Sequence, residues 1–110
     1  MNERRRDPRF LREDVSLTLT DGVKARSVNI SSRGLYCVVD TPIPEFSKLR
    51  VCIELPFCDG DRYRIECEGV VVRSDPKREA GKILYNMAIY FLNLDSERAA
   101  VIEDFLDATH

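Results

Sequence analysis

Hydrophobic side chains recur at every second position along most of this sequence. Six such runs occur, at residues 15–19, 23–30, 35–39, 49–55, 63–72 and 87–91. A period of two is that of a β-strand, whose successive side chains point to opposite faces of the sheet, so that one face of each strand can be buried. Six short strands predict a mostly β fold, a six-stranded antiparallel β-barrel, since closing the sheet removes most of its exposed edges.

The segments between these runs have the composition of turns and loops. Asp21-Gly22 is a strong hairpin signal, and Pro, Ser, Asn and Gly mark the other interruptions. We therefore expect turns or loops at residues 21–22, 31–34, 41–47, 58–61 and 74–81.

One helix is predicted after the last strand, over about residues 95–107. Asp95 is suited to the N-cap position, and Glu97 places a carboxylate in the first turn. The segment carries one apolar stripe at helical spacing, formed by Val101, Ile102, Phe105 and Leu106. We expect this stripe to cover an open end of the barrel.

The charge of the chain is unevenly distributed. The 110 residues carry a net charge of -2, and their number suits a single domain. Residues 1–12 nevertheless hold five arginines, Arg4, Arg5, Arg6, Arg9 and Arg12. We expect a flexible basic arm at 1–12 that binds an anion, followed by the barrel and helix at 13–110. The acidic body disfavours long polyanions as partners.

Several classes of function are disfavoured by what the sequence lacks. No apolar run approaches the roughly 20 residues of a membrane span, and the charged N-terminus does not resemble a secretory signal, so we expect a cytoplasmic protein. The four cysteines form no C-x-x-C pair, and the only histidine is His110, so no metal site and no cofactor are expected. Cys37 and Cys67 are predicted to be small core residues.

Catalysis is also not expected. No serine or cysteine has a recognisable basic partner, and the chain has no internal histidine. Asp59 and Asp61 flank Gly60 in a predicted turn, where solvated carboxylates are the expected outcome. We therefore predict that the protein is not an enzyme.

Two short motifs carry the binding chemistry. Pro8 disfavours helix at Asp7, so Arg5 and Arg9 belong to an extended or turning segment. Their guanidinium groups can bind phosphate, or the O6/N7 edge of guanine, through paired hydrogen bonds. Taken alone, such an arm is more often a solvated terminus.

The second motif follows a predicted strand. With Val28 and Ile30 directed into the core, Asn29 and Ser31 share the outer face of the strand end, where they can hydrogen-bond a ligand. Gly34 suits a position with positive φ. Taken alone, this motif is also typical of an ordinary β-turn.

Together the motifs are much more specific. The R-x-x-x-R of Arg5 to Arg9, followed about twenty residues later by the N-x-S-x-x-G of Asn29 to Gly34, resembles the two-part signature of the PilZ family. Pro8-Arg9-Phe10 is similar to the family's entry into its first strand. The segments 69–73 and 88–91 resemble later strands of the family, although the family often has glycine where this chain has Ala88.

The resemblance implies a barrel that binds cyclic di-GMP, a dianion with two guanine bases. It implies that Arg5 and Arg9 grip guanine edges and phosphates, that Asn29 and Ser31 hydrogen-bond the ligand, and that Gly34 shapes the turn. The full predicted site is Arg4, Arg5, Arg6, Arg9, Asn29, Ser31, Arg33 and Gly34. The arginine that precedes the motif, Arg4, implies binding of a self-associated pair, two ligand molecules per chain.

Two alternatives to this function remain open. One is a PilZ-like module that binds only proteins and has lost the ligand. The other is a small barrel that binds nucleic acid, which requires exposed aromatic residues along a basic groove. Tyr63, Phe91 and Phe105 fall on predicted core faces, and Tyr36 and Tyr90, which could be exposed, have no basic groove beside them.

The sequence does not name a downstream partner. A receptor of one domain must pass its signal to another protein through a change in conformation or in oligomeric state. A homodimer is therefore left open, and no nucleic-acid partner is expected.

Overall fold

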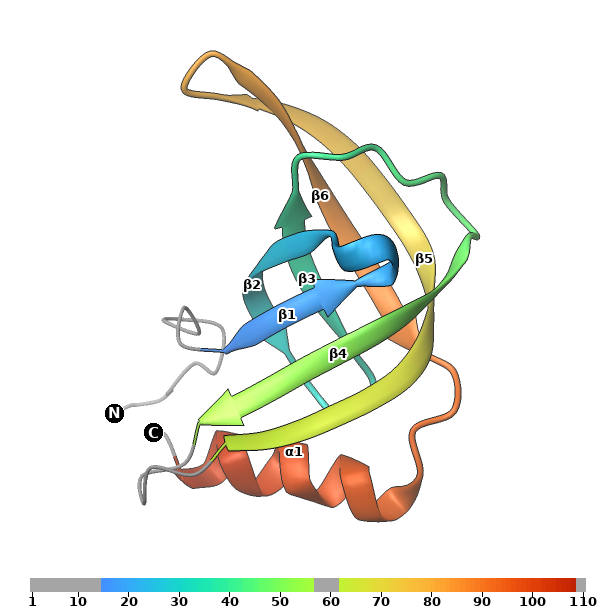
Figure 1. Ribbon diagram of the computed structural model, residues 1–110, viewed down its shortest axis with the longest axis vertical. Helices are drawn as coiled ribbons and strands as arrows, with labels where there is room; N and C mark the ends of the chain where they lie inside the picture. Colours follow the sequence, from blue (N-terminus) through green and yellow to red (C-terminus); the bar gives the residue numbers. More distant parts are fainter. Residues whose placement is uncertain (1–14, 57–61, 109–110) are drawn as a thin grey trace, which may run out of the picture.

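The fold is a closed antiparallel barrel with one helix at its end, seen in a computed structural model that describes residues 15–56 and 62–108 (Figure 1). The strands follow one another around the barrel in the order β1-β2-β3-β6-β5-β4. Their bounds are β1 Ser16–Leu19, β2 Lys24–Ile30, β3 Gly34–Val39, β4 Lys48–Pro56, β5 Arg62–Glu79 and β6 Lys82–Phe91, followed by α1, Ser96–Ala108. The predicted barrel and C-terminal helix are confirmed. The predicted arm and the predicted turn at 58–61 lie outside the described residues.

The alternating pattern of the sequence produces the barrel interior. Buried and exposed positions alternate along β1, β4 and the C-terminal half of β6, with apolar side chains at the inward positions, as the pleat of a strand requires. The interior side chains include Leu17, Leu19, Ile30, Leu35, Val51, Ile53, Leu55, Ile65, Val71, Met87, Ile89 and Phe91. The first hairpin turn also forms as predicted, with Asp21 and Gly22 both at positive φ.

Two of the cysteines belong to this interior. Cys37 and Cys67 are buried, as the sequence predicted. Burial raises the pKa of the Cys37 thiol to about 12. Cys37 is therefore a neutral packing residue rather than a nucleophile.

The prediction of a polar loop at 74–81 was wrong. Residues 74–79 continue β5 and pair with β6, and only Ala80 and Gly81 form the turn. Both have positive φ, 53° and 78°, the geometry of a tight hairpin turn whose twist matches the strands. Figure 1 shows the end of this hairpin extending past the barrel, and the residues of β5 within it, 74–79, carry almost no apolar side chains. The alternation of apolar and polar residues that identified the other strands is therefore missing from this part of β5.

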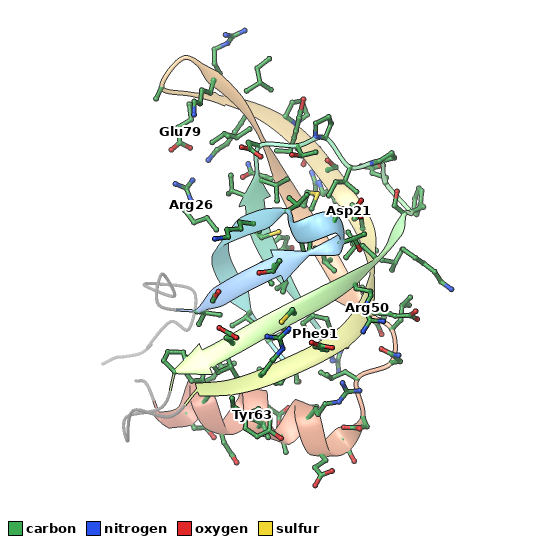
Figure 2. All side chains as sticks on the ribbon, in the orientation of Figure 1. Asp21, Arg26, Arg50, Tyr63, Glu79 and Phe91 are labelled. Carbon is green, nitrogen blue, oxygen red and sulfur yellow. The ribbon has the colours of Figure 1, made fainter. Side chains whose placement is uncertain are left out.

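The extended hairpin is also linked to β2. Arg26 and Glu79 form an ion pair of 3.4 Å, and Figure 2 shows their side chains facing one another across the gap. Both side chains are largely solvated, so the pair contributes little to stability.

Tyr63 lies on the face that the sequence assigned to the core, but it is not buried there. Tyr63 pairs with the buried Leu55, so it has the register of the inner face. Its side chain is nevertheless 42% exposed, because it is the second residue of β5 and lies at the rim of the barrel.

Helix α1 covers the end of the barrel, as predicted (Figure 1). Ile102 and Phe105 are fully buried in the core, and Val101 and Leu106 pack against it. The N-cap is Asp95, whose Oδ1 accepts a hydrogen bond of 2.8 Å from the backbone N–H of Arg98. This hydrogen bond lowers the pKa of Asp95. The structure describes no helix that is long and apolar enough to span a membrane.

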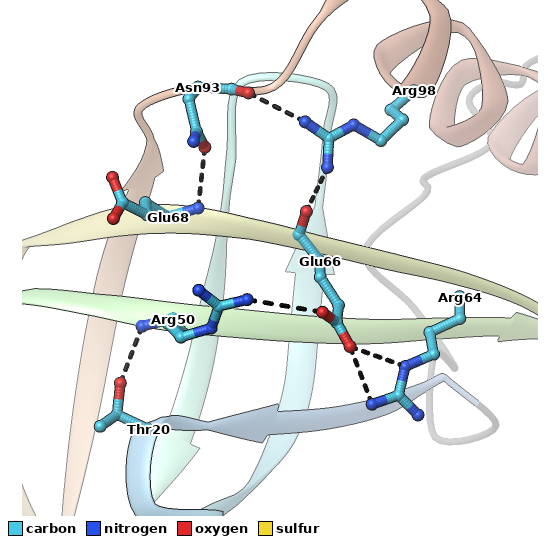
Figure 3. Close-up of polar contacts among 7 residues, drawn as sticks. All are labelled: Thr20, Arg50, Arg64, Glu66, Glu68, Asn93 and Arg98. Carbon is cyan, nitrogen blue, oxygen red and sulfur yellow. Dashed lines mark hydrogen bonds and ion pairs between the residues drawn. The ribbon is translucent and has the colours of Figure 1, made fainter.

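Arg98 fixes the start of the helix against β5 (Figure 3). Its guanidinium donates hydrogen bonds to the backbone carbonyl of Glu66 and, at 3.0 Å, to that of Asn93. The Asn93 side chain in turn accepts a hydrogen bond of 2.8 Å from the backbone N–H of Glu68. The connection from β6 to α1 is thus held to β5 by side chains on both sides of the helix start.

Truncation of the helix stripe tests this account of the core. Phe105→Ala removes a ring that is 1% exposed, and we expect the free energy of unfolding to fall by about 3–5 kcal/mol. The control is Ile83→Ala, a large apolar side chain that is 51% exposed on the hairpin, which should change stability by less than about 0.5 kcal/mol. Urea denaturation measures both. Equal, small changes would contradict the role of α1 as the cover of the barrel.

Candidate functional site

A shallow depression of about 290 Å³ lies on the outer face of the barrel, over β3 and β6, and we call it the β3–β6 depression. Its lining comprises Asn29, Ser31, Arg33, Gly34, Leu35, Tyr36, Val72, Ala88, Ile89 and Tyr90. Four of these, Asn29, Ser31, Arg33 and Gly34, are predicted site residues, so the structure brings together every predicted site position that it describes. Arg4, Arg5, Arg6 and Arg9 lie outside the described residues.

The turn between β2 and β3 is organised by Ser31. Its backbone N–H donates to the Gly34 carbonyl at 2.9 Å. Its hydroxyl oxygen accepts hydrogen bonds from the backbone N–H groups of Arg33, at 3.1 Å, and Gly34, at 3.3 Å. A serine side chain that captures backbone donors in this way fixes a turn without help from a strand partner. The same hydroxyl donates a hydrogen bond of 3.3 Å to the Gly34 carbonyl, so Ser31 shapes the rim of the depression.

Gly34 is required for a reason other than the predicted one. The sequence suggested a position with positive φ, but among the described glycines only Gly22 and Gly81 have one. Gly34 is instead the first residue of β3 and pairs with Tyr90. A Cβ at this position would lie 2.3 Å from the carbonyl oxygen of Ile89. The glycine thus permits a close approach of the β3 and β6 backbones.

A β-bulge sets the orientation of Asn29. The register of β2 against β3 shifts by one residue between Ser27 and Asn29, after which Asn29 pairs with Tyr36 and Ile30 with Leu35. Ile30 and Leu35 are buried, so Asn29 and Tyr36 lie on the outer face. The predicted outward position of Asn29 and inward position of Ile30 are confirmed, whereas the side chain of Val28 is not among those described.

A second bulge supplies an apolar wall. The register of β5 against β6 shifts between Val71 and Arg73, which leaves Val72 as the extra residue. Val71 is fully buried, but Val72 is exposed and lines the depression. Bulges commonly redirect a side chain beside a functional site in this way.

Sequence reasoning missed the apolar floor of the depression. Tyr36, Tyr90 and Ala88 occupy outward positions of β3 and β6, where a strand with one buried face usually carries polar residues. The two tyrosines, which the sequence allowed to be exposed, are 55% and 52% exposed. The sequence feature that could have revealed this floor is the pair of tyrosines at positions that the hydrophobic alternation predicts to be exposed to solvent.

The lining has the chemistry of a surface that binds a planar polar molecule. It offers an amide, a hydroxyl and a guanidinium at one edge, beside two aromatic rings and two small aliphatic side chains. The part of the chain that the structure describes contains no group of three or more metal-ligating side chains.

A second hollow, of about 220 Å³, lies between η1 (Thr20–Gly22) and β4 and presents charged side chains. Arg64 and Arg50 both contact Glu66 there, at 2.9 Å and 3.5 Å (Figure 3). The hydrogen bond from Arg64 lowers the pKa of Glu66. Because these charges already satisfy one another, this hollow is a weaker candidate than the β3–β6 depression.

Comparison with known proteins identifies a matching family and matching folds. The model of the PilZ domain family matches residues 3–108. No curated protein sequence matches the chain.

Solved structures with this fold include two bacterial proteins. One is the Bacillus subtilis inhibitor of motility, MotI/DgrA, with a TM-score of 0.71 and 20% identity over 86% of this chain. The other is Borreliella burgdorferi PlzA in complex with c-di-GMP, with a TM-score of 0.60 and 13% identity over 84% of this chain. The matches cover only 45% and 43% of those two proteins, so this chain spans less than half of their length.

Proposed function

This chain belongs to the PilZ domain family, and from that premise we propose that it binds cyclic di-GMP in the β3–β6 depression. The family and the ligand in the PlzA structure support a role as a cyclic di-GMP receptor in general terms. The observation that carries the specific proposal is that Asn29, Ser31, Arg33 and Gly34 all line one depression with an aromatic floor.

The volume of the depression indicates which part of the ligand each of the two motifs would contact. Its volume of about 290 Å³ is at the small end of the roughly 300–1,000 Å³ typical of ligand sites, and it is open to solvent. It can hold one part of a cyclic dinucleotide, and the remainder needs a second surface. We assign that surface to the arm, whose Arg5 and Arg9 would bind guanine edges and phosphates.

The remaining predicted residues complete the proposed site. Asn29 and Ser31 would hydrogen-bond the base and nearby ligand oxygens at the edge of the depression, and Arg33 would add a cation beside them. Arg4 and Arg6 would neutralise further negative charge, which favours two ligand molecules per chain. The equivalence point of a titration well above the dissociation constant counts them.

We further propose that the signal leaves the site through α1. The turn of the second motif contacts this helix directly, because the Ser32 hydroxyl donates a hydrogen bond of 2.9 Å to Oε2 of Glu103. The carbonyl of Arg33 also accepts a hydrogen bond of 2.9 Å from the backbone N–H of Phe91, near the start of the connection to α1. A ligand that rearranges the turn would act on the helix, and a downstream protein or a second copy would detect the change. Since the ligand is an intracellular messenger, we place the protein in the bacterial cytoplasm.

Arginine substitutions in the arm test the site. Arg5→Ala and Arg9→Ala should each weaken binding of cyclic di-GMP by about 2–4 kcal/mol, since each removes a charged contact. Isothermal titration calorimetry measures the change. The matched control is Arg78→Ala in the distal hairpin, which should leave the affinity almost unchanged. An equal loss in the Arg78 variant would show that the arm acts by general charge and that the assignment is wrong.

Hydrogen exchange tests the signal path. Saturating cyclic di-GMP should change amide exchange in residues 99–106 of α1, and Ser32→Ala should reduce that change at least twofold without abolishing binding. The control is Ser74→Ala, whose residue lies in β5 and outside the lining of the depression. Identical exchange of α1 in the free and bound states of the unsubstituted protein would rule out this path.

A further inference from the structure

Two tyrosines stand on opposite corners of the β3–β6 pair. Tyr36 of β3 pairs with Ala88 of β6, and Gly34 of β3 pairs with Tyr90 of β6. The tyrosines therefore occupy one diagonal of a four-residue square on the outer face, and the two smallest side chains occupy the other. All four residues line the depression.

The register gives the expected spacing of the two tyrosines, and we call the space between them the slot. Diagonal neighbours on the same face of an antiparallel pair are about 7–8 Å apart. A flat ring placed between two others needs a van der Waals contact of about 3.5 Å on each side. The separation is therefore suited to one aromatic base. Gly34 has no side chain and Ala88 only a methyl group, so neither fills the space between the tyrosines.

The surroundings of the slot are asymmetric. On one side the bulge in β5 directs Val72 toward it, which supplies an apolar wall. On the other side Asn29 pairs with Tyr36, and the turn of Ser31 and Arg33 follows. A base in the slot would contact a tyrosine ring on each of its two faces. Hydrogen-bonding groups of the protein would lie along only one edge of the base.

We propose that Tyr36 and Tyr90 clamp one guanine of cyclic di-GMP by stacking on its two faces. This inference rests on the proposed function and adds two residues that lie outside both signature motifs. Stacking does not distinguish guanine from adenine, because every base has a π-face. The clamp therefore supplies affinity, and base selectivity stays with the edge contacts of the arm and of Asn29.

Substitutions that separate aromaticity from bulk test the clamp. Tyr36→Leu and Tyr90→Leu should each weaken binding of cyclic di-GMP by roughly tenfold, the scale expected for the loss of one stacking contact. Tyr36→Phe and Tyr90→Phe should bind within about threefold of the unsubstituted protein, because the ring is retained. The ratio of the affinities for cyclic di-GMP and cyclic di-AMP should be the same in the Leu variants as in the unsubstituted protein.

Tyrosine fluorescence provides a second measurement, and its response to ligand would not be altered if Tyr36 and Tyr90 had only a structural role. The chain has no tryptophan and four tyrosines, so its intrinsic fluorescence comes from tyrosine. Stacking of a base should quench this emission, and the double variant Tyr36→Phe/Tyr90→Phe should bind the ligand with that quenching largely lost. Tyr63→Leu, on the rim of the barrel and outside the depression, should retain both affinity and quenching.

The results of these experiments distinguish a failure of the proposed clamp from a failure of the proposed receptor function. Thermal denaturation without ligand establishes that the Leu variants are folded. Leu variants that bind as tightly as the unsubstituted protein would overturn the clamp and leave the receptor role intact. An unsubstituted protein that does not bind cyclic di-GMP would overturn both.

Discussion

The pairing of β3 with β6 is the contact on which both the fold and the site depend. These strands are far apart in the sequence, and their pairing joins β1-β2-β3 to β6-β5-β4, which together with the β1–β4 pairing closes the barrel. Leu35 and Ile89 on one face of the pair enter the core, while Tyr36 and Tyr90 on the other face line the depression. The close approach at Gly34 makes this pairing possible, since a Cβ there would meet the carbonyl oxygen of Ile89.

Two bulges shape the surfaces beside this regular pair. One sits in β2 before Asn29 and the other in β5 at Val72, on opposite sides of the β3–β6 pair. Each adds one residue to a strand and so changes which side chains face outward beyond it. A polar edge on β2 and an apolar wall on β5 result, with the aromatic pair between them. The turn that begins at Ser31 then connects this surface to Glu103 of α1, the helix that closes the core.

Much of the fold could be predicted from the sequence because burial leaves a period of two. That pattern correctly placed most strands and the buried Cys37 and Cys67, and the helical spacing of apolar residues after the last strand placed the stripe at Ile102 and Phe105. The period of two failed as a guide where a strand extends beyond the buried core. Residues 74–79 of β5 lack the apolar alternation, so they were taken for a loop, and Tyr63 has inward register but lies at the rim.

The candidate site was predictable in part for a similar reason. The short motif from Asn29 to Gly34 marked the turn, and the structure places its members together around one depression. The role of Gly34 was misjudged because a close backbone approach depends on a strand more than fifty residues away, which local sequence does not reveal. The tyrosines were noticed only as exposed residues, because their alignment across β3 and β6 requires the register of the pair.

The central claim is that this chain is a specific receptor for cyclic di-GMP. Isothermal titration of the protein with cyclic di-GMP and, separately, with cyclic di-AMP tests it most directly. Adenine presents a donor where guanine presents O6, which would leave an arginine unpaired. The account predicts saturable binding of cyclic di-GMP and binding of cyclic di-AMP that is weaker by at least a hundredfold. Equal affinities for the two dinucleotides, or no heat with either, would contradict it.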